Sequence, residues 1–199
     1  KLLIFLLLVS TAAFSQTTTV SARIGFGDAE YHFVEALRTT SGGGIFGGGF
    51  VDNGNPEEFR DVYAGAGHNI PVPGVTVQAV AFISRTSGST AVATTSLVPW
   101  VLAYGNVGRV LGTANYFVYT PIGDEGPAVQ TLEHAKAEWD FGPALGGAGV
   151  TGTKTGDGSW TSTPFITGTL KHKLGSFEVW VTDPTEDGRT YRLRYLKSF

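Results

Sequence analysis

Charged side chains occur at alternate positions in two stretches of the sequence. The first set is His134, Lys136, Glu138 and Asp140, and the second is Arg192 and Arg194. In an extended strand, residues two apart share a face, so each set forms a row of charges. If the strands that carry these rows close around a lumen, the charges face it. Opposite charges can then pair and close the pore, or stay hydrated and set the electrostatics of a channel. A simpler interpretation is that they only fill and solubilise a narrow interior.

The residues that could support catalysis or bind a metal lack the required spacing. The only imidazoles are those of His32, His68, His134 and His172. A serine hydrolase needs one of them beside a serine and a carboxylate, but the sequence has no Gly-x-Ser-x-Gly elbow and no His-Glu-x-x-His helix. The acidic residues of the expected loops do not have the spacing of an EF-hand. The sequence therefore predicts no catalytic residue, no metal site and no cofactor.

The composition favours an all-β protein and excludes a nucleic-acid partner. The chain has 199 residues, 42% of them apolar, 12% aromatic, and 28 glycines. Its 14 basic and 17 acidic side chains give a net charge of −3, whereas binding to phosphates needs a concentrated basic surface. Cysteine is absent, so stability must come from the sheet rather than from disulfides.

The first fifteen residues have the pattern of a secretory signal peptide. Lys1 precedes an apolar run over residues 2–14, and Ala13 lies at the small position upstream of a cleavage site between Ser15 and Gln16. A retained membrane anchor is the alternative, but the run is shorter than the roughly 20 residues of a spanning helix. We therefore expect residues 1–15 to be removed and residues 16–199 to form a single domain.

The rest of the chain divides into about twelve segments of strand length, of roughly ten residues each. Longer polar connections are expected at 52–58, 84–95, 121–127, 154–159 and 183–188. Shorter ones are expected at 41–44, 71–74, 105–106, 142–143 and Gly175. The two kinds alternate along the chain, which places long loops at one end of a sheet and tight turns at the other.

Residues 28–38 are compatible with two structures. Tyr31, Phe33 and Leu37 alternate as in a strand, whereas Asp28 could cap a short helix with Val34 on its apolar side. The strand is favoured because strands are expected on both sides.

The last segment carries a more specific pattern. Tyr191, Leu193, Tyr195 and Phe199 share one face of an extended strand. Arg192, Arg194 and Ser198 share the other, and Lys197 is the one charged residue on the apolar face. This stretch resembles the closing strand of bacterial outer-membrane β-barrels, in which a terminal Phe belongs to the signal that the insertion machinery reads.

The resemblance implies a closed antiparallel transmembrane β-barrel of about twelve strands, with ten or eight as alternatives. It implies a location in the outer membrane of a Gram-negative bacterium, with lipid and the insertion machinery as partners. The expected function is a narrow porin-like channel for small polar solutes, or a structural surface protein. The alternative is a secreted or periplasmic all-β binding module.

Overall fold

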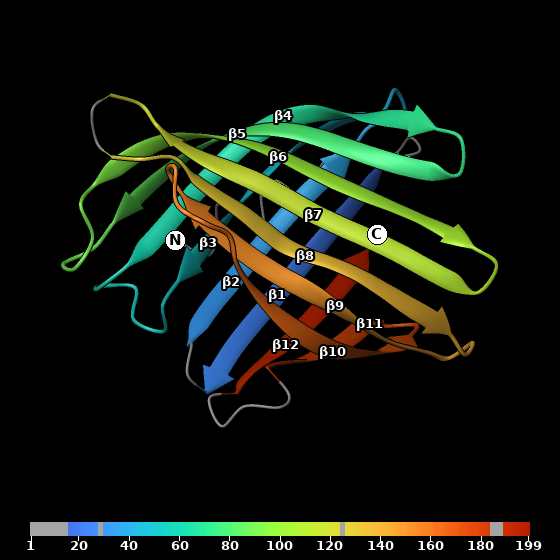
Figure 1. The fold of residues 1–199 in the computed structure, drawn as a ribbon. Helices are drawn as coiled ribbons and strands as arrows, with labels where there is room; N and C mark the ends of the chain where they lie inside the picture. The colour runs from blue at the N-terminus through green and yellow to red at the C-terminus, as the bar shows by residue number, and fades with distance from the viewer. Residues whose placement is uncertain (1–15, 28–29, 124–125, 184–188) are drawn as a thin grey trace.

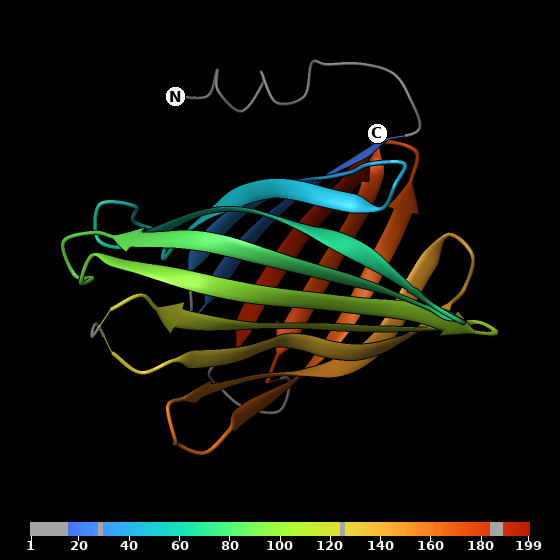
Figure 2. The same ribbon diagram turned by 90° about the horizontal axis from the view of Figure 1, so that it is seen from above.

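The computed structural model describes residues 16–27, 30–123, 126–183 and 189–199, which form twelve strands. The strands are β1 (Thr17–Gly27), β2 (Tyr31–Thr39), β3 (Gly44–Asp52), β4 (Arg60–Val72), β5 (Val75–Ser87), β6 (Thr94–Val107), β7 (Val110–Pro121), β8 (Val129–Asp140), β9 (Ala144–Thr155), β10 (Thr161–His172), β11 (Gly175–Thr182) and β12 (Thr190–Ser198). Each strand pairs antiparallel with its neighbours in the sequence, and β1 pairs with β12 (Figure 1). Figure 2 shows the blue first strand and the red last strand side by side where the sheet closes. The predicted twelve-stranded barrel is confirmed.

The uncertain segment near the N-terminus is a strand. Residues 31–39 form β2, which pairs with β1 on one side and β3 on the other. The alternative of a short helix is wrong, because the two neighbouring strands take up the backbone hydrogen bonds of this segment; Asp28, its proposed cap, lies outside the described residues. The proposed signal peptide at residues 1–15 also lies outside them. None of the described residues forms an apolar helix of membrane-spanning length.

The connections alternate in length as expected. The connections at one end are 40–43, 73–74, 108–109, 141–143 and 173–174, and we call this the short-turn end. The other end carries 53–59, 88–93, 122–128, 156–160 and 183–189, and we call it the long-loop end. One turn is displaced from its expected place at 105–106: Gly105 pairs with Gly112, and the chain reverses at Gly108, whose φ of 59° suits a tight turn.

The outer surface of the barrel is apolar. Ile24, Val62, Ile83 and Leu193, from four different strands, expose 45% to 51% of their surface. Along each strand these residues alternate with side chains that point inward. Because hydrocarbon offers no hydrogen-bond partners, a sheet with such a face must leave no unpaired edge, and closure of β1 on β12 meets that requirement.

Alternation of apolar and polar residues predicts that the polar face of each strand points into the lumen. The structure shows that the interior is polar only in part. A buried apolar cluster lies inside the barrel on β3, β5 and β6, and it consists of Ile45, Val80, Phe82, Val98 and Trp100. The polar-lumen prediction is therefore wrong for this part of the wall. Apolar residues on both faces of β6 are compatible with a barrel strand because one face meets the outside and the other packs within the lumen.

On the side of the barrel away from this cluster, glycines in the wall leave room for bulky side chains. A Cβ at Gly149 of β9 would lie 2.5 Å from the Ala135 carbonyl oxygen and 2.6 Å from the Phe165 ring. The ring of Phe165 is 1% exposed and cannot move away freely. A side chain at Gly149 would therefore overpack this wall.

We expect Gly149→Ala to lower the free energy of unfolding by about 1–3 kcal/mol, the usual range for overpacking. The measurement is urea unfolding of the detergent-solubilised barrel, followed by tryptophan fluorescence. Gly168→Ala is the control, because a Cβ at Gly168 of β10 meets nothing within 4 Å. Equal stability of the two variants would contradict the packing described for β9.

Candidate functional site

A β-bulge in β8 determines which side chains enter the lumen. The pairing of β7 with β8 shifts between Asn115 and Tyr116, and that of β8 with β9 shifts between Leu132 and Ala135. As a result, the adjacent residues Glu133 and His134 both line internal cavities. A bulge has this effect because the extra residue changes the phase of the alternation.

The bulge corrects one expectation from the sequence. Strict alternation along residues 133–139 predicts that Glu133 lies on the outward face with Ala135, Ala137 and Trp139. This prediction is wrong. The carboxylate points inward, with 10% of the side chain exposed. The missed signal was a lone Glu on an otherwise apolar face, where a charge would have to face the membrane interior.

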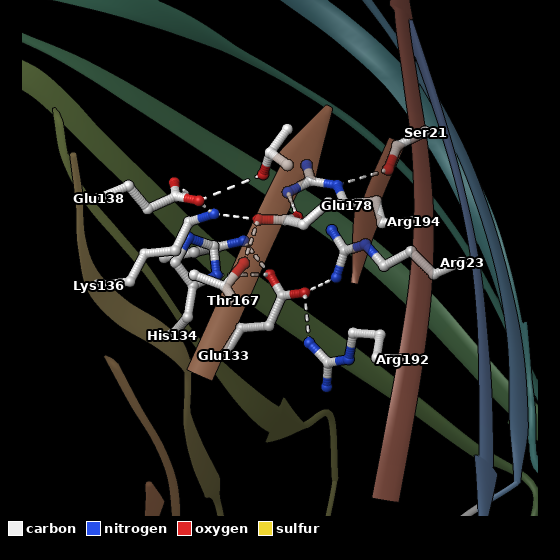
Figure 3. Close-up of polar contacts among 12 residues, drawn as sticks. Ser21, Arg23, Glu133, His134, Lys136, Glu138, Thr167, Glu178, Arg192 and Arg194 are labelled. Carbon is white, nitrogen blue, oxygen red and sulfur yellow. Dashed lines mark hydrogen bonds and ion pairs between the residues drawn. The ribbon is translucent and has the colours of Figure 1, made fainter. Parts of the chain in front are cut away.

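Glu133 joins the two sides of the barrel through ion pairs. Its carboxylate contacts the Arg23 guanidinium of β1, and Nη1 of Arg192 on β12 lies 3.6 Å from Oε1. Asn115 of β7 donates a hydrogen bond to the same carboxylate. Because β8 is adjacent neither to β1 nor to β12, these ion pairs cross the lumen (Figure 3).

A second group of ion pairs lies beside the first. Lys136 of β8 contacts Glu178 of β11, and its Nζ lies 2.8 Å from Oε2 of Glu138. Arg194 Nη1 is 3.4 Å from the other oxygen of Glu178, and Thr169 Oγ1 donates to Glu138 at 3.2 Å. Both groups appear together in Figure 3. We call these two groups of ion pairs the partition.

The structure brings together five of the six charged residues singled out in the sequence. His134, Lys136, Glu138 and Arg194 line one internal cavity, and Arg192 lines another. His134 is 1% exposed and meets the Trp180 ring edge to face at 5.2 Å. Asp140 lies apart at the end of β8, where its exposed carboxylate pairs with Lys171 at 2.8 Å.

Three charged members of the partition were missed in the sequence: Arg23, Glu133 and Glu178. For Arg23 and Glu178 the signal was present, because each alternates with outward apolar residues as Arg192 does. Arg23 precedes Ile24, and Glu178 lies between Phe177 and Val179, which are 47% and 43% exposed.

The lumen behind the partition is filled. Phe165 of β10 and Trp180 of β11 stack at 4.3 Å with their planes 8° apart, and both are 1% exposed. Gly149 of β9 provides the space for the Phe165 ring. Around Phe165 and Trp180, the arc from β9 to β11 is therefore packed like a protein core, whereas Thr169 of β10 and Glu178 of β11 border an internal cavity nearer the short turns.

The arc on the other side of the partition presents aromatic side chains to the lumen. The aromatic wall consists of Phe33, Tyr63, Phe82, Trp100, Phe117 and Tyr119. Tyr63 and Trp100 each meet Phe82 edge to face, at 5.1 Å and 6.1 Å. Such pairs add stabilisation beyond the area that they bury, so the wall is held in a defined arrangement.

Two carboxyl groups lie beside the aromatic wall, that of Asp61 buried and that of Glu35 partly buried. Tyr63 donates a hydrogen bond to Glu35 at 3.0 Å, and Tyr119 donates one to Asp61 at 3.0 Å. Asp61 also accepts a 2.5 Å hydrogen bond from Ser84. These hydrogen bonds fix the phenol groups, and with them the rings.

The open space lies between the partition and the aromatic wall. A cavity of about 300 Å³, the long-loop cavity, is bounded by the aromatic wall, Arg23, Arg192 and Glu133. Among the described residues, none from β9 to β11 lines it. A second cavity of about 420 Å³, the short-turn cavity, is lined by charged and hydroxyl side chains near the short-turn end, including Lys136, Thr169 and Ser198.

Four residues border both cavities and separate them. This constriction layer consists of Arg23, Glu35, Trp100 and Asn115. It combines an aromatic side chain, an amide and two opposite charges. A solute that crosses the barrel along these cavities must pass it.

The four residues of the closing-strand pattern belong to the outer surface. Leu193 and Phe199 expose 45% and 68% of their surface, and the rings of Tyr191 and Tyr195 contact outward-facing Phe26 and Phe177. The exception, Lys197, extends to the short-turn rim and donates a hydrogen bond to the Lys173 carbonyl at 2.7 Å. A lysine can therefore lie on the apolar face here, because its amine reaches the polar rim of the barrel.

The fold is similar to that of porins. The KdgM porin matches over 91% of this chain and 99% of its own, with a TM-score of 0.63 and 14% identity. An outer membrane channel from Pseudomonas putida F1 matches over 96% of this chain and 97% of its own, with a TM-score of 0.58 and 8% identity. No protein-family model matches the sequence, and no curated protein matches it. At these identities the likeness shows the fold, a closed barrel of the porin type.

We expect Glu133→Gln to lower the free energy of unfolding by about 3 kcal/mol, because it leaves buried guanidinium charges without their carboxylate. Urea titration in detergent measures this loss. Asp140→Asn is the matched control: it removes one carboxylate from the same strand, but from an exposed pair, so stability should change little. If the two variants lose the same stability, Glu133 does not hold the partition together.

Proposed function

We propose that the protein is an outer-membrane channel with a narrow passage for small solutes. The observation that carries the proposal is the pair of internal cavities in series, one along the aromatic wall and one nearer the short turns, which meet at the constriction layer. A barrel of eight strands is filled by side chains, whereas twelve strands leave room for a narrow passage. Here the partition fills one part of the lumen and leaves that room on the other side.

The outer surface supports the location. Its apolar side chains come from many strands, and a surface of this kind is unfavourable in water. Lipid is therefore the proposed partner of the outer face. We further propose that residues 1–15 direct export and are removed, and that residues 16–199 form a single domain.

A channel rather than an enzyme also agrees with the solved structures that share the fold, which are a porin and an outer membrane channel. The KdgM porin has also been solved in complex with disordered oligogalacturonate; that structure matches with a TM-score of 0.60 at 13% identity, over 91% of this chain and 98% of its own. Binding of a solute is thus compatible with a barrel of this shape. His134 is assigned to the wall of the lumen and not to catalysis.

Two alternatives are separated by simple observations. A secreted or periplasmic binding module would stay monomeric and folded without detergent, whereas the proposed barrel requires it. A structural surface protein would insert into a planar bilayer but show no conductance across a range of salts and voltages.

We expect purified protein to give single-channel currents in a planar bilayer, and Trp100→Ala to increase the conductance. Trp100 is 7% exposed and belongs to the constriction layer, so truncation of its side chain widens the passage. The control is Trp139→Ala, because Trp139 is 47% exposed on the outer face. Unchanged conductance in W100A would place the ion path elsewhere.

We expect Phe199→Ser to reduce the amount of barrel in the outer-membrane fraction. The proposal assigns Tyr191, Leu193, Tyr195 and Phe199 to recognition by the insertion machinery. Phe141→Ser is the matched control: Phe141 is 63% exposed at the same rim, against 68% for Phe199, but does not belong to the C-terminal pattern of Tyr191, Leu193, Tyr195 and Phe199. Immunoblots of membrane fractions measure the difference, and equal levels of the two variants would count against a signal in the last strand.

A further inference from the structure

The long-loop cavity has two chemically different sides. The aromatic wall provides ring faces, of which Trp100 and Phe117 belong to neighbouring strands. Across the barrel from Trp100 and Phe117, the partition presents the guanidinium groups of Arg23 and Arg192, and Arg23 lies 4.2 Å from the centre of the Phe33 ring, where the two sides meet. A solute that lies in the cavity therefore touches rings on one side and cations on the other.

The hydrogen-bonding groups on the charged side are unequal in number. Each guanidinium carries five N–H donors. Arg23 and Arg192 share the one carboxylate of Glu133, which also accepts a hydrogen bond from Asn115. Within the described part of the chain, Arg23 Nε and Arg192 Nη1 are buried without a hydrogen-bond acceptor, and Glu133 Oε1 and Asn115 Oδ1 are buried without a hydrogen-bond donor. Even with these two oxygen atoms, the N–H donors of the two guanidinium groups outnumber the acceptors on this side of the cavity.

The remaining carboxyl group of the cavity does not correct this imbalance. Glu35 lines the cavity, and it accepts the hydrogen bond of Tyr63 at 3.0 Å. The ion pairs of Arg23 and Arg192 are formed with Glu133 instead. Glu35 therefore holds the aromatic wall and also interacts electrostatically with Arg23, so Arg192 is the guanidinium group that keeps donors for a further acceptor.

Arg192 is the group best placed to bind an anion. Its side chain is 18% exposed, against 7% for Arg23. Its guanidinium lies 4.4 Å from the centre of the Trp180 ring and 5.3 Å from that of Tyr31. Contacts with two rings orient the planar group before any ligand arrives.

We propose that the long-loop cavity is a binding site for a small carboxylate with a flat apolar ring. The carboxylate binds to Arg192, and the ring packs against Trp100 and Phe117. A volume of about 300 Å³ is at the lower limit of small-molecule pockets, so a single ring is the appropriate size. The inference rests on the proposed function, because it places the site on the path of the solute.

Benzoate is the probe, added to the folded protein in a non-ionic detergent and measured by isothermal titration calorimetry with empty micelles as the blank. Acetate lacks the ring, benzyl alcohol lacks the charge, and benzylammonium reverses it. We expect benzoate to bind more tightly than all three by about tenfold or more. Against benzyl alcohol and benzylammonium, this is the contribution of one charge-assisted hydrogen bond. Against acetate, it is the contribution of the ring that packs on Trp100 and Phe117. Equal binding of benzyl alcohol would overturn the role of the carboxylate, and equal binding of acetate that of the ring.

Variants locate the site. Arg192→Gln should weaken benzoate binding by about tenfold, whereas Lys171→Gln should not, because Lys171 lines the short-turn cavity and lies outside the partition. Phe117→Ala should weaken it as well, with the outward-facing Phe177→Ala as its control. Glu133→Gln should bind benzoate more tightly, because it releases two guanidinium groups from their carboxylate; misfolding cannot produce such a gain. Unchanged affinity in both R192Q and E133Q would overturn the site.

The binding and channel proposals fail in different ways. Calorimetry needs a folded barrel but no open passage, whereas bilayer currents need the passage but no benzoate. Currents without benzoate binding would overturn the binding site and leave the channel in place. Benzoate binding without currents would overturn the channel and leave the binding site in place.

Discussion

The structure depends on closure of the sheet between its first and last strands. Nine consecutive residue pairs join β1 to β12, from Thr19 with Ser198 to Gly27 with Thr190. This pairing removes both edges, so that the outer face can be apolar without exposing unpaired backbone groups to a non-polar surrounding. It also fixes which residues face inward, since the alternation of every strand is tied to that of its neighbours.

A closed barrel of twelve strands has a wider interior than one of eight strands, whose inward side chains fill the lumen. The barrel reduces the space from two directions, with stacked rings on β10 and β11 and with ion pairs that cross from β8 to β1, β11 and β12. The bulge is essential to this arrangement, because it adds Glu133 to the inward row that already contains Lys136 and Glu138. Buried ion pairs add little net stability compared with apolar packing. Their role here is to divide the lumen.

The fold could be predicted from the sequence because its main rule is local. Alternation within each strand and the positions of the turns were enough for about twelve antiparallel strands. Closure into a barrel, with Arg192 and Arg194 facing inward, was implied by the resemblance of the last strand to the closing strand of outer-membrane barrels. The bulge left one signal, the lone charge of Glu133 on an otherwise apolar face, but strict alternation does not show which residue of β8 is the extra one.

The division of the lumen was also beyond the sequence. An apolar residue is acceptable both on the outer face and within a packed interior, so the pattern of β6 could not show that Trp100 faces inward. The contacts of Arg23 with Glu133 and of Lys136 with Glu178 join strands that are not neighbours. They depend on the shape of the closed barrel, which no single strand specifies.

The partition also affects how the two arcs of the barrel can change during evolution. On β9 to β11, inward substitutions must preserve the fit of Phe165 and Trp180 against glycine, so this arc is constrained as a protein core is. On β2, β4 and β7, the inward rings border the long-loop cavity, so a change of ring size or polarity there alters the cavity. Phe82 of β5 and Trp100 of β6 border it too, but they also belong to the buried apolar cluster, so a change at either alters packing and cavity together. The cavity can therefore change at least cost to the fold through the rings outside the buried cluster.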